Sequence, residues 1–551
     1  VLDALAARGT RWEQAITSTP LTLPAHSSLF TGLTPPEHGV QENGSTVLPK
    51  SLPTLAEAFS ARGYATAGFV ASLVLDGRFG LTRGFGAYDD HISAEPEPGH
   101  GPGERDARQM TDLALAWLRR APKGKPVFLW VHYVDPHYPY TPPDVKPGAG
   151  ARERYAGEVT FMDREIGRLL AALPGGAERW LIAAVADHGE SLGEHGEQGH
   201  GIFLYHTTLH VPLILAGPGV PRGRVVREAV EPRRLAASLL RLMAPGRAAA
   251  SFGAPLPGLP GVASGPPGPI YLTCRYLFST FGWSPLEGIF DGRFKLIVVP
   301  RPELYDLAAD PGETRNLLEG PPEQWQPARK LRRELAAMRG AFKIHPAEAA
   351  DPELQSALQS LGYLSGSGSG GKGTLDPKDG VLLLAERDSA FELVNRKGWK
   401  AAASKLTELV RRDPENAWFL SDLGKAQLAS GKGDAAIATF RRAVEANPRR
   451  IAAYCELAGA YAQEGRREEA RREYELALTL SPRFPDAWKG LVRLAEKTGD
   501  LAKIRAVLTR AVAAGTESPW ILKRLAAIEQ TAGDTAAAER HRAEARRLAG
   551  S

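Results

Sequence analysis

Cysteine is nearly absent from this 551-residue chain, which contains only Cys274 and Cys455. Because the two lie far apart in segments of different character, a disulfide framework is excluded, and cysteine usage does not indicate a compartment. No run of about 18 apolar residues occurs, so the sequence contains no transmembrane segment. The net charge of +5 is small for this length and gives no reason to expect nucleic acid or a membrane surface as partner.

The chain begins with Val1 instead of methionine, and no signal peptide is visible. Residues 1–10 read as a helix already under way, which we expect to be capped at its carboxyl end by Gly9. We therefore expect native residues upstream of Val1, so the missing targeting sequence does not indicate where the protein is located.

Residues 1 to about 345 alternate apolar runs with amphipathic segments. The apolar runs predict strands at 64–71, 127–134, 180–186 and 211–216. The segments between them predict helices at 51–62, 106–120 and 152–173. This alternation favours an α/β fold with a doubly wound, mostly parallel sheet covered on both faces. Residues 288–300 and 303–307 predict short antiparallel strands, and hence a small α+β lobe.

A glycine- and serine-rich stretch at 364–374 predicts a flexible linker, and the pattern after it is wholly helical. Pro414, Pro448 and Pro482 follow one another at intervals of 34 residues. This period resembles that of tetratricopeptide repeats, although a generic helical bundle is the alternative. Such repeats stack into a solenoid whose concave face binds a protein or peptide. We therefore predict three parts: a domain at 1–363, a linker at 364–380 and a repeat domain at 381–551.

Two distant segments suggest one reactive site. Thr22 begins the segment 22–32 and offers a hydroxyl nucleophile on what we expect to be a tight turn. Asp187 and His188 follow the apolar run 181–186, and ligands of open α/β sheets collect at the carboxyl ends of such strands. One carboxylate and one imidazole suit Mn, Zn or Mg better than an all-oxygen calcium cage. The alternative is an Asp that caps the next turn beside a solvent-exposed His.

Eleven of the thirteen histidines lie between positions 26 and 210. Asp135 and His137 follow the apolar run 128–134, and His200 lies between glycines in the segment 196–201. Either histidine could hold an anionic oxygen or protonate a leaving group. Taken singly, a histidine in a loop is more often an ordinary surface residue, and it is the shared neighbourhood of the two that favours a functional role.

Four segments in this order resemble the sulfatase branch of the alkaline phosphatase superfamily: 3–9, 23–32, 186–196 and 303–317. The resemblance covers residues 1–363. It implies a doubly wound α/β sheet, a smaller carboxyl-terminal sheet, and a nucleophile bound directly to a divalent cation (Mn, Zn, Mg or Ca). It also implies that the family's first strand and a pair of Asp metal ligands lie before Val1. Relatives are commonly exported, so we expect a cell-envelope or periplasmic location.

The resemblance also implies roles for individual residues by position. Thr22 takes the place of the nucleophile, and His26 takes the place of the arginine that supports it. Asp187 and His188, together with Thr22, take the places of metal ligands. His137 and His200 take the places of basic residues that contact the substrate.

Thr22 departs from the family pattern in a way that bears on the chemistry. Sulfatases of this branch oxidise a Cys or Ser to formylglycine, and oxidation of threonine cannot give that aldehyde. Pro24 matches the family's pattern, but residues 68–72 lack two substrate-contacting groups that many sulfatases carry. We therefore predict a metal-dependent hydrolase or transferase that acts on a phosphodiester or phosphomonoester through a covalent Thr22 intermediate.

Three alternatives remain open at this point. The first is a sulfuric ester hydrolase that uses threonine directly. The second is a non-catalytic scaffold in which the repeats act and the α/β domain is a relic. The third is an enzyme that is inactive in the form of this chain, because the expected Asp ligands precede Val1.

Overall fold

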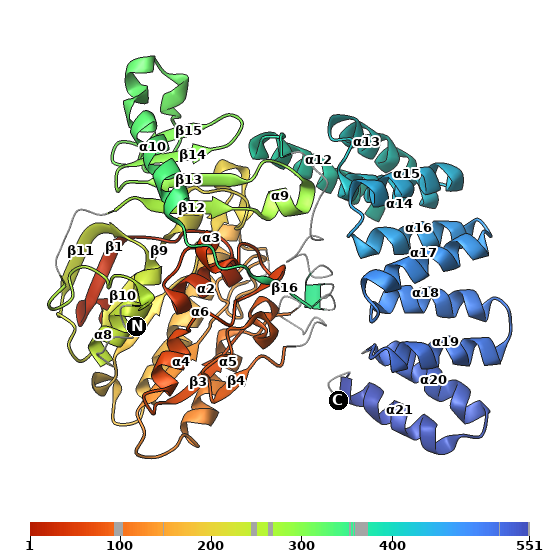
Figure 1. Ribbon diagram of the computed structural model, residues 1–551, viewed down its shortest axis with the longest axis horizontal. Helices are drawn as coiled ribbons and strands as arrows, with labels where there is room; N and C mark the ends of the chain where they lie inside the picture. The colour runs from red at the N-terminus through yellow and green to blue at the C-terminus, as the bar shows by residue number, and fades with distance from the viewer. Residues whose placement is uncertain are drawn as a thin grey trace. The chain divides into compact units, whose positions relative to one another are not determined.

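The computed structural model describes residues 1–92, 103–146, 148–243, 251–262, 268–351, 354–355, 358, 373–516 and 518–548. These residues form two compact units (Figure 1). The first unit contains Val1–Leu277 and Ser284–Ala350, and the second contains Phe278–Trp283 and the helical region that follows the first unit. Residues 364–372 of the predicted linker lie outside the described residues, and helix α12 already begins at Pro377.

Two sheets lie within residues 1–243 of the first unit. The larger sheet has the strand order β11 (Arg224–Val230), β1 (Thr10–Ile16), β10 (Leu213–Ala216), β6 (Ile182–Val185), and β9 (His210–Val211) also pairs with β1. The other sheet has the order β4 (Ala87–Asp89), β3 (Ala65–Phe69), β5 (Val127–Val131), and both of its pairings are parallel. Each strand predicted from an apolar run is present.

The strands do not form the single, mostly parallel sheet that we predicted. β10 runs antiparallel to both β1 and β6, and only the pairing of β1 with β11 is parallel in the larger sheet. The reason lies in the connection from β6 to β10, where the four-residue helix α7 (His206–Leu209) is the longest helix. A parallel return needs a long crossover, usually a helix, whereas an antiparallel return does not.

Helices cover the sheets of the first unit. They are α1 (Leu2–Ala7), α2 (Thr22–Thr31), α3 (Pro35–His38), α4 (Leu55–Ser60), α5 (Ala107–Leu118), α6 (Ala151–Ala171), α7 and α8 (Leu235–Met243). α4 and α5 begin at capping boxes, in which Thr54 and Asp106 accept the third backbone N–H of their helices. The apolar faces of α5 and α6 pack against β3 and β5 around Met110, Ala114 and Leu169. Short strand pairs complete the unit: β2 (Thr46–Val47) with β16 (Glu348–Ala349), and β7 (Ser191–Leu192) with β8 (Gln198–Gly199).

Gly9 has a different role from the one we predicted. Helix α1 ends with Arg8 as its C-cap. A Cβ at Gly9 would lie 2.2 Å from the carbonyl oxygen of Leu215 in β10. Glycine is therefore needed at this position so that the backbone entering β1 can approach β10 closely.

A smaller antiparallel sheet confirms the predicted short strands, but it has four strands, because the segment predicted at 288–300 holds parts of two strands and a further strand precedes them. Its order is β12 (Ile270–Cys274), β13 (Leu286–Phe290), β14 (Phe294–Val298), β15 (Glu303–Asp306). Helix α10 (Gln326–Ala341) buries Leu331 and Leu335 against this sheet. The expected α+β lobe is therefore present, at 270–341. Helix α9 (Tyr276–Phe281) leads into Trp283, whose Nε1 donates a hydrogen bond to Asp413 of the second unit, the unit to which Phe278–Trp283 belongs.

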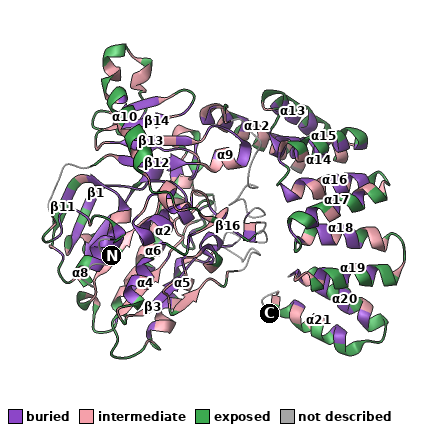
Figure 2. Cartoon of the chain, in the orientation of Figure 1, coloured by how far each residue is buried: buried purple, intermediate pink, exposed green. Residues whose placement is uncertain are grey.

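The second unit is all helical, as the 34-residue period predicts. Its helices are α12 (Pro377–Asn395), α13 (Trp399–Arg412), α14 (Ala417–Ala429), α15 (Gly433–Ala446), α16 (Ile451–Gln463), α17 (Arg467–Leu480), α18 (Pro485–Glu496), α19 (Leu501–Ala513), α20 (Pro519–Thr531) and α21 (Thr535–Leu548). Figure 1 shows them stacked in chain order. Figure 2 shows buried and exposed faces on the same helices, as expected when each helix packs only on its neighbours.

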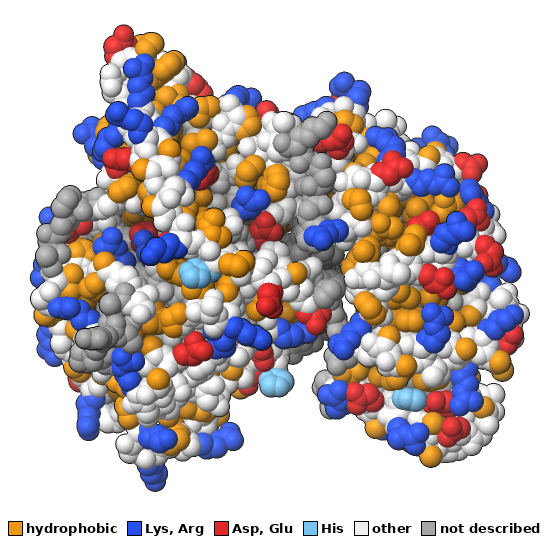
Figure 3. Space-filling model, in the orientation of Figure 1, with side chains coloured by type: hydrophobic (Ala, Val, Ile, Leu, Met, Phe, Trp, Pro, Cys, Tyr) orange, Lys and Arg blue, Asp and Glu red, His pale blue; other side chains and the backbone are white. Residues whose placement is uncertain are grey.

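The surface and the helices add two observations. None of the helices in the described part of the chain combines the length and the hydropathy needed to cross a bilayer. On the face that Figure 3 shows, Lys and Arg side chains are interspersed with Asp and Glu. This mixture agrees with the small net charge of the sequence.

Candidate active site

Thr22 lies at the first position of helix α2 and not on a tight turn, so that prediction is corrected. Leu21 is the N-cap, and all ten residues of α2 are buried. The first turn of a helix has backbone N–H groups without partners inside the helix, which favours negative charge nearby. One of them, Leu23 N, donates to Asn43 Oδ1 at 2.9 Å. The Thr22 hydroxyl is therefore held at an electropositive, buried helix end.

The sheet order brings Asp187 and His188 to Thr22. β1 and β6 each run antiparallel to β10, so they run parallel to each other, and their carboxyl ends lie at one edge of the sheet. Thr22 follows β1, and Asp187 follows β6. Thr22 Oγ1 lies 3.1 Å from His188 Nε2, and Asp187 Oδ2 lies 3.3 Å from the same nitrogen. Two segments more than 150 residues apart therefore meet, as we expected.

His26 lies one helical turn after Thr22 and faces the same site. Its Nδ1 lies 2.8 Å from the carbonyl oxygen of Thr22 and 3.5 Å from Asp187 Oδ2. Because a carbonyl oxygen only accepts, the Nδ1 of His26 carries the proton. His26 also packs edge-on against His132, with ring centroids 5.0 Å apart. His26 thus links the backbone of the nucleophile to the carboxylate.

The charges of this cluster follow from its burial. Burial raises the pKa of Asp187, but the neighbouring His188 and His26 outweigh it and lower that pKa to about 2. Burial lowers the pKa of His188 to about 4 and that of His132 to about 3. The carboxylate is therefore ionised and His188 is neutral near neutral pH, which is the protonation state of metal ligands.

His137 and His200 form a second cluster with Glu190. The Nε2 atoms of His137 and His200 lie 3.2 Å apart, and Glu190 Oε1 lies 3.9 Å from His200 Nε2. The rings of His200 and His188 stack with centroids 3.9 Å apart, so the two clusters share one site. All six residues that we singled out for this site are therefore brought together: Thr22, His26, His137, Asp187, His188 and His200.

Three carboxylates that we did not predict from the sequence hold this site. Glu104 Oε1 lies 3.0 Å from His137 Nδ1. Glu158 of α6 accepts hydrogen bonds from the backbone N–H groups of His137, at 3.0 Å, and Thr141. Glu190 Oε2 accepts from the Tyr140 hydroxyl at 2.7 Å. Only Glu190, inside the segment 186–190, stood in a motif that could have revealed it.

The donor atoms fit a divalent cation. Asp187 Oδ2 is buried and accepts no hydrogen bond, although it lies near His188 and His26. Thr22 Oγ1, Asp187 Oδ2 and His188 Nε2 converge within a few ångströms of one another. One hydroxyl, one carboxylate and one imidazole suit a borderline cation such as Zn or Mn. His137, Glu190 and His200 also offer three potential ligand atoms within 4.8 Å of one another.

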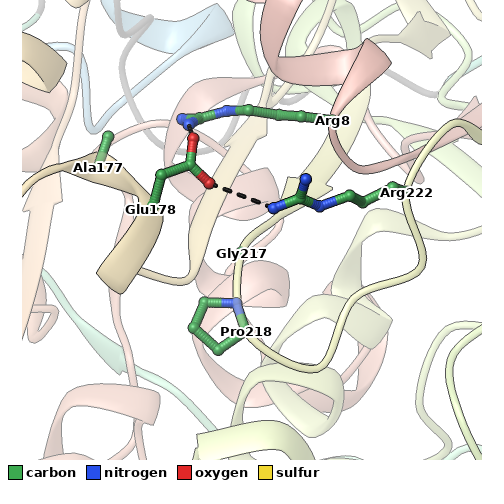
Figure 4. Close-up of a pocket in the computed structure, with 6 residues that line it drawn as sticks. All are labelled: Arg8, Ala177, Glu178, Gly217, Pro218 and Arg222. Atoms are coloured by element: carbon green, nitrogen blue, oxygen red, sulfur yellow. Dashed lines mark hydrogen bonds and ion pairs between the residues drawn. The ribbon is translucent and has the colours of Figure 1, made fainter.

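A surface pocket elsewhere in the first unit has different chemistry (Figure 4). It is lined by Arg8, Ala177, Glu178, Gly217, Pro218 and Arg222. Glu178 pairs with Arg8 at 2.6 Å and with Arg222 at 3.5 Å, as the dashed lines in Figure 4 show. The pocket therefore contains one carboxylate shared by two guanidinium groups, and none of the candidate site residues lines it.

Comparison with known proteins agrees with this arrangement. The sulfatase family model matches residues 1–245, and tetratricopeptide repeat models match residues 397–460, 451–484 and 485–528. The chain is 26% identical over 396 residues to the uncharacterized sulfatase YidJ of Escherichia coli, covering 58% of this chain and 78% of that protein. It is 25% identical over 406 residues to the choline-sulfatase of Rhizobium meliloti, covering 58% and 77%.

Solved structures give the same result for the fold. The structure of a 2-O GAG sulfatase matches with a TM-score of 0.52 and 21% identity, over 64% of this chain and 89% of that chain. A phosphonate monoester hydrolase from Silicibacter pomeroyi matches with a TM-score of 0.50 and 22% identity, over 62% and 90%. The chain therefore has an amino-terminal domain of the sulfatase family, in the alkaline phosphatase superfamily, followed by tetratricopeptide repeats.

Proposed function

We propose that the first unit hydrolyses a sulfuric ester, with Thr22 as the nucleophile and a divalent cation held by Thr22, Asp187 and His188. The observation that carries this proposal is the meeting of Thr22 Oγ1 and His188 Nε2 at 3.1 Å beside a buried, ionised Asp187. From Thr22 alone we predicted a phosphoester. The names of the relatives, mostly sulfatases, favour a sulfuric ester instead.

The nucleophile is oriented by its neighbours. His188 Nδ1 lies 3.1 Å from the carbonyl oxygen of Gly189, which only accepts, so the neutral ring keeps its lone pair on Nε2, toward Thr22. The Thr22 hydroxyl therefore donates to His188 in the structure described. A bound divalent cation would lower the pKa of the hydroxyl and neutralise charge on the ester oxygens.

His137 supplies the proton for the leaving group. Burial lowers its pKa, but Glu104 and further carboxylates outweigh burial and raise that pKa to about 9, so His137 is protonated at neutral pH. Thr22 Oγ1 gives up its proton to water and attacks sulfur, the bond from sulfur to the leaving oxygen breaks, and His137 protonates that oxygen. Water then cleaves the threonine sulfate ester, which releases sulfate and restores the hydroxyl.

A phosphoester is the second candidate, and Thr22 itself favours it. A threonine hydroxyl cannot form the aldehyde of the usual sulfatase mechanism, but it can carry a phosphoryl group. The same pocket would serve, because phosphate and sulfate esters both present anionic oxygens to the cation, His137 and His200. A non-catalytic scaffold is the third candidate. In it the repeats act, and the α/β domain is a relic that catalyses no reaction.

We also propose that the repeat region binds a protein or peptide on its concave face. Residues 397–528, which run from α13 into α20, match tetratricopeptide models, and stacked repeats of this kind expose an extended concave surface.

The first prediction concerns Thr22→Ala. p-Nitrophenyl sulfate, p-nitrophenyl phosphate and bis-p-nitrophenyl phosphate are supplied to one metal-loaded preparation of the full-length protein. We expect the sulfate ester to be the preferred substrate and Thr22→Ala to lower its turnover by about a hundredfold or more, because the attacking atom is lost. Thr160→Ala, an exposed threonine on α6, is the control and is expected to keep activity.

The three candidates separate cleanly in this experiment. Preferred turnover of a phosphoester, lost in Thr22→Ala, would favour the second candidate. Undiminished turnover in Thr22→Ala would remove Thr22 as nucleophile. A protein that retains no stoichiometric cation and turns over none of the three esters would favour the scaffold.

A further inference from the structure

A buried ion pair of the α+β lobe holds the backbone of the segment 204–206. Lys295 on β14 pairs with Glu313, and the two side chains are 0% and 1% exposed. Lys295 Nζ also donates to the carbonyl oxygen of Leu204 at 2.8 Å. Glu313 Oε2 accepts the backbone N–H of His206 at 2.6 Å. Both charged groups therefore bind the backbone of one short segment.

A third contact from the same lobe holds the residue between these two. The Tyr205 hydroxyl lies 3.2 and 3.1 Å from the two carboxylate oxygens of Glu303, a buried residue on β15. The Tyr205 ring also stacks on His195, with centroids 3.7 Å apart. Three consecutive residues are thus each fixed by a different side chain of the lobe. We call these side chains the loop clamp: Lys295, Glu303 and Glu313.

The loop clamp is costly to bury. Taking an ammonium group and a carboxylate out of water carries a desolvation penalty that their mutual attraction often does not recover. Glu313 in addition lies at a φ of 54°, in the left-handed region that residues other than glycine adopt uncommonly. A packed apolar pair would join the lobe to the rest of the unit without either cost. The polar groups are therefore explained by what they bind, which is the segment 204–206.

The clamped segment follows almost directly on the loop that carries His200. Glu197 Oε1 accepts the backbone N–H of Ile202 at 2.7 Å, so the loop 197–202 is closed at its base. Only one residue separates this base from the segment 204–206. A short loop that is closed in this way moves with the segment to which it is joined. The loop clamp therefore sets the position of His200.

His200 in turn orients the acid of the proposed mechanism. Burial lowers the pKa of His200 to about 4, so its ring is neutral at neutral pH. Its Nδ1 donates to the carbonyl oxygen of Pro20 at 2.9 Å, which leaves the lone pair on Nε2. The Nε2 of the protonated His137 lies 3.2 Å from that atom and donates to it. His200 therefore fixes the direction of the proton that His137 supplies.

We propose that Lys295, Glu303 and Glu313 are positioning residues that place His200 and, through it, the proton of His137. The α+β lobe then contributes to catalysis without supplying a group that touches the ester. The proposal rests on the proposed function, because turnover is one of its two readouts. The other readout, the position of the His200 ring, does not depend on turnover.

Removal of the buried ion pair from the zinc-loaded, full-length protein tests the proposal. In Lys295→Met/Glu313→Gln both charges are gone, methionine keeps most of the length of the lysine chain, and the amide oxygen can still accept from His206. We expect kcat on the preferred ester to fall about ten- to a hundredfold with KM nearly unchanged, because a small displacement of a positioned group costs this much. The nitrogen-15 resonances of the His200 ring, assigned with His200→Gln, should shift as well.

Arg293→Met/Asp306→Asn is the matched control. Arg293, which precedes β14, pairs with Asp306 of β15 at 2.7 Å, but this pair lies at the surface of the lobe, with Arg293 61% exposed. We expect the control to keep both kcat and the His200 resonances. Tyr205→Phe removes only the hydroxyl that binds Glu303 and should change both readouts in the same direction by less. It also decides the question where the first double variant does not fold.

Two results would overturn the proposal. One is an unshifted His200 ring in both Lys295→Met/Glu313→Gln and Tyr205→Phe. The other is an equal loss of kcat in Lys295→Met/Glu313→Gln and in the control, since the clamp would then only stabilise the lobe. If the unmutated protein turns over no ester, the proposed function fails, and the His200 resonances alone decide whether the clamp positions this ring.

Discussion

At the scale of single residues, Glu158 shows how the site depends on groups that never touch the substrate. Its side chain is buried on α6, and its carboxylate accepts the N–H groups of His137 and Thr141, which lie four residues apart in the loop after β5. A carboxylate can accept both, because it offers only acceptors. Glu158 therefore acts as a positioning residue for His137.

Glu158→Gln tests this positioning role. The amide keeps the size of the side chain but presents N–H donors where an acceptor is needed, so one of the two hydrogen bonds is lost. We expect kcat to fall about ten- to a hundredfold with KM nearly unchanged, because the imidazole that protonates the leaving group is displaced while the nucleophile stays in place. Steady-state kinetics on the preferred ester measures the changes in kcat and in KM separately.

Glu153→Gln, an exposed carboxylate on the first turn of the same helix, is the control. An unchanged kcat in Glu158→Gln, accompanied by a lower melting temperature, would mean that Glu158 only stabilises the loop.

The site residues that can be predicted from the sequence are those that stand in motifs. Thr22, His26, Asp187 and His188 follow strand-like runs or match an ordered set of segments, so the sequence alone indicates them as candidates. Glu104 and Glu158 carry no such mark, because they reach His137 from positions 33 and 21 residues away in sequence. His132 was also missed, although its burial beside His26 keeps that ring in place.

At the scale of elements, hydrophobic periodicity predicted where strands and helices lie but not how strands pair. The apolar runs at β3, β5, β6 and β10 are equally compatible with parallel and with antiparallel pairing. Direction is set by the connections, and the segment between β6 and β10 contains short elements such as β7, β8 and the four-residue helix α7. The same segment carries His188, Glu190 and His200, so the connection that departs from the parallel pattern is also the one that supplies candidate site residues.

Helix pairing in the repeats can be tested with two glycines that face one tyrosine. A Cβ on Gly490 of α18 would lie 2.1 Å from the Tyr474 ring, whereas a Cβ on Gly459 of α16 would lie 3.9 Å from its hydroxyl. We expect Gly490→Ala to destabilise the second unit by about 1–3 kcal/mol through overpacking. Gly459→Ala should instead stabilise it by up to about 1 kcal/mol, because alanine is the better helix former.

Urea unfolding followed by circular dichroism measures both changes, and each variant serves as the control for the other. Equal stability changes of the same sign in the two variants would contradict the close packing of α17 against α18 at Tyr474.

At the scale of the whole molecule, two compact units with separate cores should respond to acid differently. In the second unit, Arg450 lies 2.9 Å from Glu456, and Lys425 lies 2.9 Å from the other oxygen of the same carboxylate. Burial raises the pKa of Glu456, but these two cations outweigh it and lower that pKa from 4.5 to about 2. The folded state therefore binds this proton more weakly than the unfolded chain does.

The sign of the pH dependence follows from this difference. Above pH 4.5 the carboxylate is ionised in both states, and its stabilisation of the second unit is fully present. As the pH falls from about 4.5 to about 2, the unfolded chain takes up the proton first, so this stabilisation is progressively lost. A shift of this size corresponds to a loss on the order of 3 kcal/mol.

Calorimetry of the full chain should therefore show an unfolding transition of the second unit whose midpoint temperature falls as the pH is lowered from about 4.5 to about 2. In Glu456→Gln the midpoint temperature of this transition should be lower at neutral pH than in the unmutated protein. It should also change less on acidification, because the titrating group is gone. Glu445→Gln removes an exposed carboxylate of α15 and should follow the unmutated protein at every pH. If Glu456→Gln and Glu445→Gln gave the same pH profile, the buried Arg450–Glu456 pair would not be what couples the stability of this unit to protons.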